Sequence, residues 1–305
     1  TVAPAFGPAE IERMREGAVA RTSAVLDNLP IGTPFDWVEA VSIELTTLML
    51  AILFDFPSEE RHKLTNWSDV GGDIEIGSTP EGRLYRQQTG MEMAGAFMQL
   101  WQHKAQNPGG NDLVSIMLQS DAMSHMQPQE FLANLVLLIV GGNDTTRNSM
   151  SALAWGLHLY PDQRAILEAN YSPELAVNAM HEIIRWQTPL SHMRRTATED
   201  TEICGQAIRK HDRIALWHAS ANRDESIFPD ADHIPVEREN ARRHLAFGYG
   251  IHRCVGARLA ELQLTTLIGE LQKRRLRING VEAPEIVPAC FVHGYRKMMV
   301  QLERY

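Results

Sequence analysis

The sequence predicts a single, mainly α-helical domain with a small β region toward its C-terminal half. Long stretches of the first 190 residues carry apolar side chains at the spacing of helices packed on a core. Residues 194–220 instead alternate around a Cys-Gly-Gln turn, as the strands of hairpins do. Neither an internal repeat nor a linker divides residues 1–305, so we expect one domain.

Apolar spacing and the residues at the ends of each stretch predict these helices. The first begins with Pro-Ala-Glu at Pro8, the second ends before Pro57, and the NPGGN segment separates the fourth from the fifth. The glycine-rich segment 71–82 is predicted to be a loop. The six predicted helices cover residues 8–29, 35–56, 58–70, 83–106, 127–160 and 173–186.

The C-terminal half is predicted to change character after residue 190. The hairpin region at 194–220 is followed by an irregular, charged and proline-rich segment at 221–246. A final helix is expected at 255–275, and the tail ending in MMVQLERY resembles a strand.

The composition excludes several classes of protein. The chain is 44% hydrophobic and 22% charged with a net charge of -9, which argues against a general nucleic-acid binder. Its longest apolar run, 131–140, is about half the length that a membrane span needs. Cys204, Cys254 and Cys290 lie far apart without CxxC spacing, which favours neither disulfides nor structural zinc and indicates a cytoplasmic location.

One cysteine stands in a glycine-bracketed loop just before the last predicted helix. Cys254 has Gly248 and Gly250 before it and Gly256 after it. A lone cysteine is more often an inert apolar residue. Here, however, glycines allow a flat ligand to approach the main chain, and a helix N-terminus favours a thiolate. A single protein thiolate on iron is one of the ways in which proteins hold haem.

The stretch FGYGIHRCVG, from Phe247 to Gly256, resembles the haem-binding signature of the cytochrome P450 family. The resemblance implies a partial P450 fold with haem b as cofactor and a long central helix over the haem. It implies that Cys254 is the axial ligand of the iron and that Phe247 packs near its sulfur. His252 is expected to reach a haem propionate, and Gly248 and Gly256 are the outer glycines of the motif.

A second motif lies in the fifth predicted helix. LIVGGNDTTRNSM, residues 138–150, places two glycines and polar residues inside an apolar stretch, and we expect the helix to be interrupted there. The glycines alone are equally compatible with a close helix crossing. Gly142, Asp144 and Thr145 match the acid–threonine pair of the P450 family. The match implies that Thr145 hydrogen-bonds bound oxygen and that Asp144 supplies protons, with Thr146 as a less favoured relay.

A third motif is the Glu-x-x-Arg of HEIIRW, formed by Glu182 and Arg185. Such a pair could be an ordinary surface ion pair three residues apart on a helix. Its position between the Asp-Thr helix and the cysteine loop matches the P450 family, in which a third arginine locks to it. We expect Arg238 to be that arginine, with Arg242 as the alternative, and the three residues to hold the haem loop.

The resemblance also implies contacts to the haem rim and to the substrate. Arg195 matches the arginine that pairs with a haem propionate, and the neighbouring Arg194 could be mistaken for it. By position, the substrate pocket is expected to be lined by Leu137, Gly141, Leu190 and Ser191.

Whole segments, among them FDWVEAVSIELTTLMLAILFDFP, look most like bacterial alkane and fatty-acid terminal hydroxylases. The resemblance implies hydroxylation of an unactivated terminal C–H bond of a medium-chain alkane or fatty acid with O2. The alternatives are a terpene or sterol-like substrate, a haem sensor and an inactive fragment. The family's N-terminal portion finds no counterpart before TVAPAF, so we expect part of the fold to be missing.

Electrons for this reaction are expected from a ferredoxin and a ferredoxin reductase, because the chain lacks a G-x-G-x-x-G fingerprint for flavin or nicotinamide. The other expected partners are O2 and an apolar small molecule, and we expect a monomer. Four arginines near the cysteine indicate either a docking patch or a solvated basic surface: Arg242, Arg243, Arg253 and Arg258.

Overall fold

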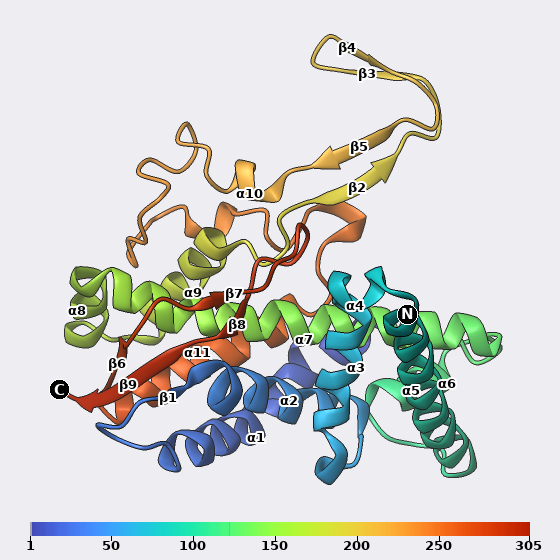
Figure 1. Cartoon of the computed structure of the whole chain (residues 1–305), viewed down its shortest axis with the longest axis horizontal. Coiled ribbons are helices and arrows are strands. Elements are labelled where there is room, and N and C mark those ends of the chain that lie inside the picture. Colours follow the sequence, from blue (N-terminus) through green and yellow to red (C-terminus); the bar gives the residue numbers. More distant parts are fainter. Residues whose placement is uncertain (1, 122) are drawn as a thin grey trace.

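The longest helix, α7 (Pro128–Leu159), crosses the helical part of the molecule and contacts helices from both halves of the chain (Figure 1). The computed structural model describes residues 2–121 and 123–305. A proline in its first turn starts α7, and the Gln127 backbone N–H donates to the Glu130 carboxylate at 3.3 Å. The helix therefore has a well-defined beginning and a length that spans the core.

The predicted interruption of this helix at Gly141-Gly142 is wrong, because α7 is continuous through both glycines. A Cβ atom on Gly142 would lie 3.0 Å from Leu50 Cδ2 of the neighbouring helix α2 (Glu44–Phe54). The glycine therefore serves a close helix crossing, and packing against α2 outweighs the low helix propensity of the pair.

Helices α1 (Pro8–Asp27), α9 (Pro173–Gln187) and α11 (Ala257–Lys273) confirm the predicted helices at their positions. Ser172 caps α9 by accepting a hydrogen bond from the Leu175 N–H at 3.1 Å. Further helical segments are shorter: 3-10 turns η1 (Ala3–Phe6), η3 (Ser58–Glu60), η4 (Ala241–Arg243) and η5 (Gly250–His252), and helices α6 (Leu113–Gln119), α8 (Pro161–Ala169) and α10 (His218–Ala221).

The predicted helix over 35–56 is only partly correct. Its first residues form strand β1 (Phe35–Asp36), followed by a π-helical turn at Val38–Ile43 before α2 begins. The Asp36 carboxylate accepts from the Val38 and Met298 N–H groups, each at 3.0 Å. These bonds tie the start of the segment to the C-terminal sheet instead of to a helix.

The segment 71–82, predicted as a loop, is largely helical. Helix α3 (His62–Gly72) runs into it, α4 (Ile74–Ser78) follows, and α5 (Pro80–Gln106) begins before it ends. The Thr79 side chain accepts from the Gly82 N–H at 3.0 Å and so caps α5. Capping and the proline in the first turn outweigh the glycine content here.

The strands form small antiparallel sheets. β2 (Met193–Thr196) pairs with β5 (Arg213–Leu216), and between them the hairpin of β3 (Thr201–Ile203) and β4 (Gln206–Ile208) projects from the body (Figure 1). The C-terminal sheet has the order β1-β9-β6, with β6 (Leu276–Gly280) and β9 (Met299–Arg304), and β7 (Glu285–Ile286) pairs with β8 (Tyr295–Lys297).

Two apolar clusters form the core and meet along α7. One joins the C-terminal half of α7 to α9, α11 and the C-terminal sheet, and the other joins its N-terminal half to α2, α3, α5 and the start of α11. The helix that carries the Asp-Thr motif and the helix that follows the cysteine loop therefore share a core. Among the described residues, no helix is both long and apolar enough to cross a bilayer.

Candidate active site

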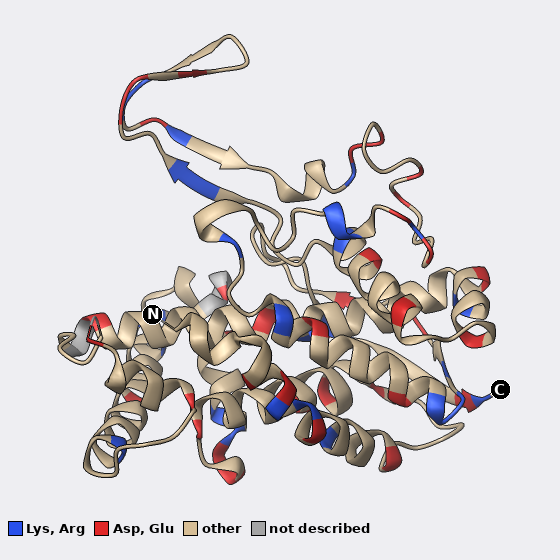
Figure 2. Cartoon of the chain, turned by 180° about the vertical axis from the view of Figure 1, so that it is seen from behind, with Lys and Arg blue, Asp and Glu red and all other residues tan. Residues whose placement is uncertain are grey.

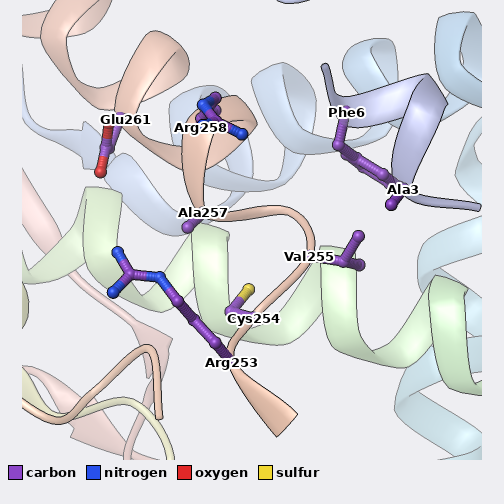
Figure 3. Close-up of a pocket in the computed structure, with 8 residues that line it drawn as sticks. All are labelled: Ala3, Phe6, Arg253, Cys254, Val255, Ala257, Arg258 and Glu261. Atoms are coloured by element: carbon purple, nitrogen blue, oxygen red, sulfur yellow. The ribbon is translucent and has the colours of Figure 1, made fainter. Parts of the chain in front are cut away.

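The loop around Cys254 is shaped by its backbone. Gly248 and Gly250 have φ values of +66° and +69°, which side chains with a Cβ rarely adopt. The turn is closed by the Cys254 N–H, which donates to the Phe247 carbonyl at 2.8 Å. This folding places Cys254 in a pocket of about 380 Å³ lined by Ala3, Phe6, Arg253, Cys254, Val255, Ala257, Arg258 and Glu261 (Figure 3).

The surroundings of the sulfur suit an iron-bound thiolate. Although the pocket leaves Cys254 exposed to water, the protein packed around the rest of its thiol raises the pKa. The backbone N–H groups of Gly256 and Ala257, where α11 begins, and the charge of Arg253 act in the opposite direction. N–H donors at a helix N-terminus stabilise a thiolate once a metal replaces the proton. These residues therefore fit a haem held through Cys254.

The other residues of the motif lie around this loop. The half-buried Phe247 ring packs near His244, with ring centroids 5.2 Å apart. His252 is exposed in the η5 turn, where its imidazole is accessible to a bound acidic group. A Cβ on Gly256 would lie 3.8 Å from the Phe6 ring, so this glycine is in ordinary contact with the opposite wall.

The face of α7 that precedes Thr145 is apolar and open. Leu137 is 70% exposed, and a Cβ on Gly141 would meet nothing within 4 Å. Thr145 lies one turn beyond Gly141 on the same face, and its hydroxyl donates to the Gly141 carbonyl at 2.8 Å. The predicted pocket residues Leu137 and Gly141 thus lie in one row with the predicted oxygen-binding threonine.

Asp144 points away from this row, toward α3. Its Oδ1 accepts from Ser68 Oγ at 3.2 Å and lies 3.1 Å from an Arg147 guanidinium nitrogen, which also pairs with Asp69 at 2.6 Å. Burial raises the pKa of Asp144, against the positive charge of Arg147, and the negative charge of Asp69 raises it further. Asp144 and Thr145 are neighbours in the chain, but their side chains have different partners.

The Glu-x-x-Arg pair is fully buried and its partner is Arg238. Glu182 and Arg185 have no exposed surface, and they form two hydrogen bonds of 2.8 and 2.7 Å. Arg238 Nε donates to Glu182 Oε1 at 2.9 Å, whereas Arg242 is exposed. The remaining Arg185 N–H groups donate to the carbonyls of residues 222, 231 and 233. All five of its donors are therefore used, and the alternative Arg242 is not part of the network.

Strand alternation separates Arg195 from Arg194. In β2 the Arg195 side chain is half-buried, while Arg194 and Thr196 are exposed on the opposite side. The positive charge of Arg195 lies close enough to His218 to lower the pKa of that histidine, after burial. Arg195 therefore lies on the half-buried face of β2, and Arg194 lies on its exposed face.

The two remaining pocket residues pair with a segment that the sequence did not single out. Leu190 forms an isolated antiparallel bridge with Val292. The Ser191 hydroxyl donates to the Cys290 carbonyl at 2.7 Å, so this side chain is engaged with the backbone. Phe291, 37% exposed, belongs to the same segment. In the sequence, the apolar run ACFV near the C-terminus is the only local pattern that indicates a segment packed against Leu190 and Ser191.

Comparison with known proteins identifies the family. The family profile described as Cytochrome P450 matches residues 174–287. The chain is 38% identical over 311 residues to linalool 8-monooxygenase of Pseudomonas putida. The alignment covers 99% of this chain and 73% of that protein. It is 30% identical to a steroid C26-monooxygenase of Mycobacterium tuberculosis (strain ATCC 25618 / H37Rv), of which it covers 67%.

Solved structures agree with this assignment. CYP153D17 from Sphingomonas sp. PAMC 26605 superposes with a TM-score of 0.93 at 61% identity, covering 99% of this chain and 75% of that one. Cytochrome P450-153 from Novosphingobium aromaticivorans gives 0.92 at 53% identity, covering 99% and 73%. With the cysteine loop and the buried Glu182–Arg238 network in place, the chain belongs to the cytochrome P450 family, haem b monooxygenases that incorporate oxygen from O2.

Proposed function

We propose that this P450 monooxygenase hydroxylates a terminal C–H bond of a medium-chain alkane or fatty acid. The observation that carries the proposal is the open apolar row on α7. Leu137 is 70% exposed, and the space beside Gly141 is free. An unbranched hydrocarbon needs apolar surface and no polar anchor along its length. The row leads to Thr145, where the reaction is expected.

The haem, when bound through Cys254, supplies the activation of O2 and the transfer of one oxygen atom to the substrate. The protein supplies position and protons. Because the Thr145 hydrogen is directed at the Gly141 carbonyl, the hydroxyl presents its lone pairs to the open face as a fixed acceptor. Asp144, whose pKa burial raises, can hold or release a proton one residue away. Arg147 and Ser68 keep its carboxylate in place.

A terpenoid or steroid substrate is the alternative, and the relatives named linalool 8-monooxygenase and steroid C26-monooxygenase support it. A substrate hydroxyl would require a polar partner in the pocket. The Ser191 hydroxyl donates to a backbone carbonyl, so its remaining lone pairs are the one polar side-chain feature among Leu190, Ser191 and Val292. These three residues therefore present a mostly apolar surface, which suits the hydrocarbon part of a substrate.

A competition assay tests this choice. The holoenzyme, supplied with a ferredoxin and its reductase, is given octane, dodecanoic acid, linalool and a sterol at equal concentrations. We expect terminal alcohols of the first two to dominate, and dominant oxidation of linalool or the sterol would contradict the proposal. Leu137→Phe, which narrows the open row, should shift the preference to shorter chains. Leu84→Phe, at a leucine on α5 that is 55% exposed, should not.

The electron donor is proposed to dock on the four exposed arginines near the cysteine: Arg242, Arg243, Arg253 and Arg258. Lys and Arg elsewhere are interspersed with Asp and Glu along the chain (Figure 2). Opposite charges on an acidic ferredoxin would accelerate association. Arg242→Glu should slow reduction by the ferredoxin but not by dithionite. Arg209→Glu, on the projecting hairpin, is the matched control, and equal rates in both variants would contradict the docking site.

A further inference from the structure

Two buried histidines, His181 and His244, lie beneath the cysteine loop and have no part in the function proposed above. They are 4% and 6% exposed, and His181 Nδ1 lies 3.2 Å from His244 Nε2. His181 belongs to α9, one residue before Glu182, while His244 begins the stretch that leads to Phe247. The contact therefore joins the helix of the buried ion pair directly to the loop that holds Cys254.

The hydrogen bonds define which ring nitrogen carries each proton. The Ala246 N–H donates to His244 Nδ1 at 3.2 Å, so a neutral His244 carries its proton on Nε2. That proton is donated to His181 Nδ1, and the His181 proton is consequently on Nε2. This nitrogen lies 3.7 Å from the Glu261 carboxylate on α11, beyond hydrogen-bond distance, and it is buried without a hydrogen-bond partner among the described residues. The three side chains lie in a row from the loop to α11, with a hydrogen bond only between the two histidines.

Burial, together with nearby positive charges, disfavours protonation of both rings. Burial lowers the pKa of His181 to about 4, and Arg242 and Arg253 lower it as well. Burial lowers the pKa of His244 to about 3, with the neighbouring His181 and Arg185 acting in the same direction. The proton arrangement described above is therefore the one that persists at neutral pH.

Both histidine rings contact Phe247, the residue that is hydrogen-bonded to the Cys254 backbone. The Phe247 ring centroid lies 5.2 Å from that of His244 and 6.4 Å from that of His181. The Phe247 carbonyl accepts the Cys254 N–H at 2.8 Å. Glu261, at the other end of the row, lines the same pocket as Cys254 (Figure 3). A displacement of either histidine would therefore also displace Cys254, because Phe247 contacts both histidines and is hydrogen-bonded to Cys254.

We propose that His181 and His244 are positioning residues that hold the Cys254 loop in the geometry required for strong thiolate ligation. The proposal rests on Cys254 being the ligand of the iron. If the pair is broken and the loop loosens, the hydrogen bonds from Gly256 and Ala257 to the sulfur weaken. A sulfur with fewer donors carries more negative charge and favours oxidised iron, so the reduction potential becomes more negative.

The test compares two substitutions of His181 in the holoenzyme. Asparagine places its Oδ1 where the histidine has Nδ1 and preserves the acceptor for His244, whereas leucine has a similar shape and no acceptor. We expect His181→Leu to lower the reduction potential and to reduce the fraction of the red-shifted Soret band in the reduced, CO-bound protein. His181→Asn should keep both at the wild-type values. His158→Leu, at the far end of α7, is the control for loss of a half-buried histidine.

A folded His181→Leu protein with the wild-type potential and band would overturn the proposal. If that variant does not fold, NMR of the wild-type CO-bound protein still tests the proposal. With its histidines labelled with nitrogen-15, the spectrum shows which ring nitrogen carries the proton. Both rings are expected in the Nε2–H form, and an Nδ1–H form at His244 would contradict the row. Absence of the red-shifted band from the wild-type protein would instead refute the ligation by Cys254 on which the proposal rests.

Discussion

Arg238 reaches Glu182 across 56 residues of sequence and donates from Nε to Oε1 at 2.9 Å. The contact joins the irregular segment before the cysteine loop to helix α9, and Arg238 also donates to the Pro229 carbonyl at 2.7 Å. The carboxylate that it contacts has no exposed surface. A charge so deeply buried depends on its partners, because water cannot replace them.

Removal of this partner should therefore be costly. We expect Arg238→Leu to lower the free energy of unfolding by about 3–5 kcal/mol, a large share of the stability of a typical domain. Urea denaturation of the holoenzyme measures it. Arg242→Leu, at the exposed arginine four residues later, should change the stability by no more than about 0.5 kcal/mol. Similar losses in the two variants would show that the buried network does not depend on Arg238.

Loss of the Thr145 hydroxyl should uncouple the enzyme. Thr145→Ala keeps the helix, since alanine is the better helix former. It removes the acceptor beside Gly141, so we expect reducing equivalents and O2 to be consumed with less product and more hydrogen peroxide. The ratio of product to peroxide is the measurement. Thr146→Ala, at a buried residue on another side of α7, is the control and should stay coupled. Full coupling in Thr145→Ala would remove Thr145 from the mechanism.

Replacing Asp144 by a residue that cannot release a proton should slow the supply of protons to the reaction. Asp144→Asn preserves the shape, and Ser68 can still donate to the remaining carbonyl oxygen. General acid–base groups contribute about 10²–10⁴-fold, so turnover should fall by about 10²-fold and its solvent isotope effect should increase. Asp69→Asn, at the partly exposed partner of Arg147, should have a smaller effect. An unchanged isotope effect in Asp144→Asn would argue against this role.

The buried histidine pair predicts a pH dependence of stability. In the folded protein the pKa values of His181 and His244 are about 4 and about 3, below the ordinary 6.5. Between pH 6.5 and 4 the unfolded chain thus binds more protons than the folded one, and stability falls on acidification. Each histidine contributes up to about 1.4 kcal/mol per pH unit. His181→Asn should flatten the urea-derived slope by this amount, and exposed His103→Asn should not; equal slopes would contradict the assignment.

The sequence was sufficient where local pattern and motif coincide. The long helices α1, α7, α9 and α11 have apolar spacing and clear ends, and the hairpin region alternates as strands must. The cysteine loop was recognisable because only glycine tolerates its positive φ angles. The sequence left both Arg238 and Arg242 open as partners of Glu182, and only the packing around Glu182 shows that Arg238 makes the contact.

Other features depended on contacts that a single segment does not encode. Gly142 was expected to break α7, whereas it allows α2 to approach. Strand β1 exists because Phe35 and Asp36 pair with residues at the far end of the chain. The wall formed by Val292 opposite Leu190, and the contact between His181 and His244, likewise join distant segments. Tertiary pairing of this kind overrides local propensity and leaves no local pattern.

The central claim is that Cys254 is the thiolate ligand of the haem, and the spectrum of the reduced, CO-bound holoenzyme tests it most directly. The wild-type protein should show the red-shifted Soret band of a thiolate-bound haem. Cys254→Ser should lose that band, while Cys204→Ser and Cys290→Ser, which remove the other two thiols, should retain it. A wild-type protein with the ordinary band of a histidine-bound haem, or a Cys254→Ser variant that keeps the red-shifted band, would contradict the account.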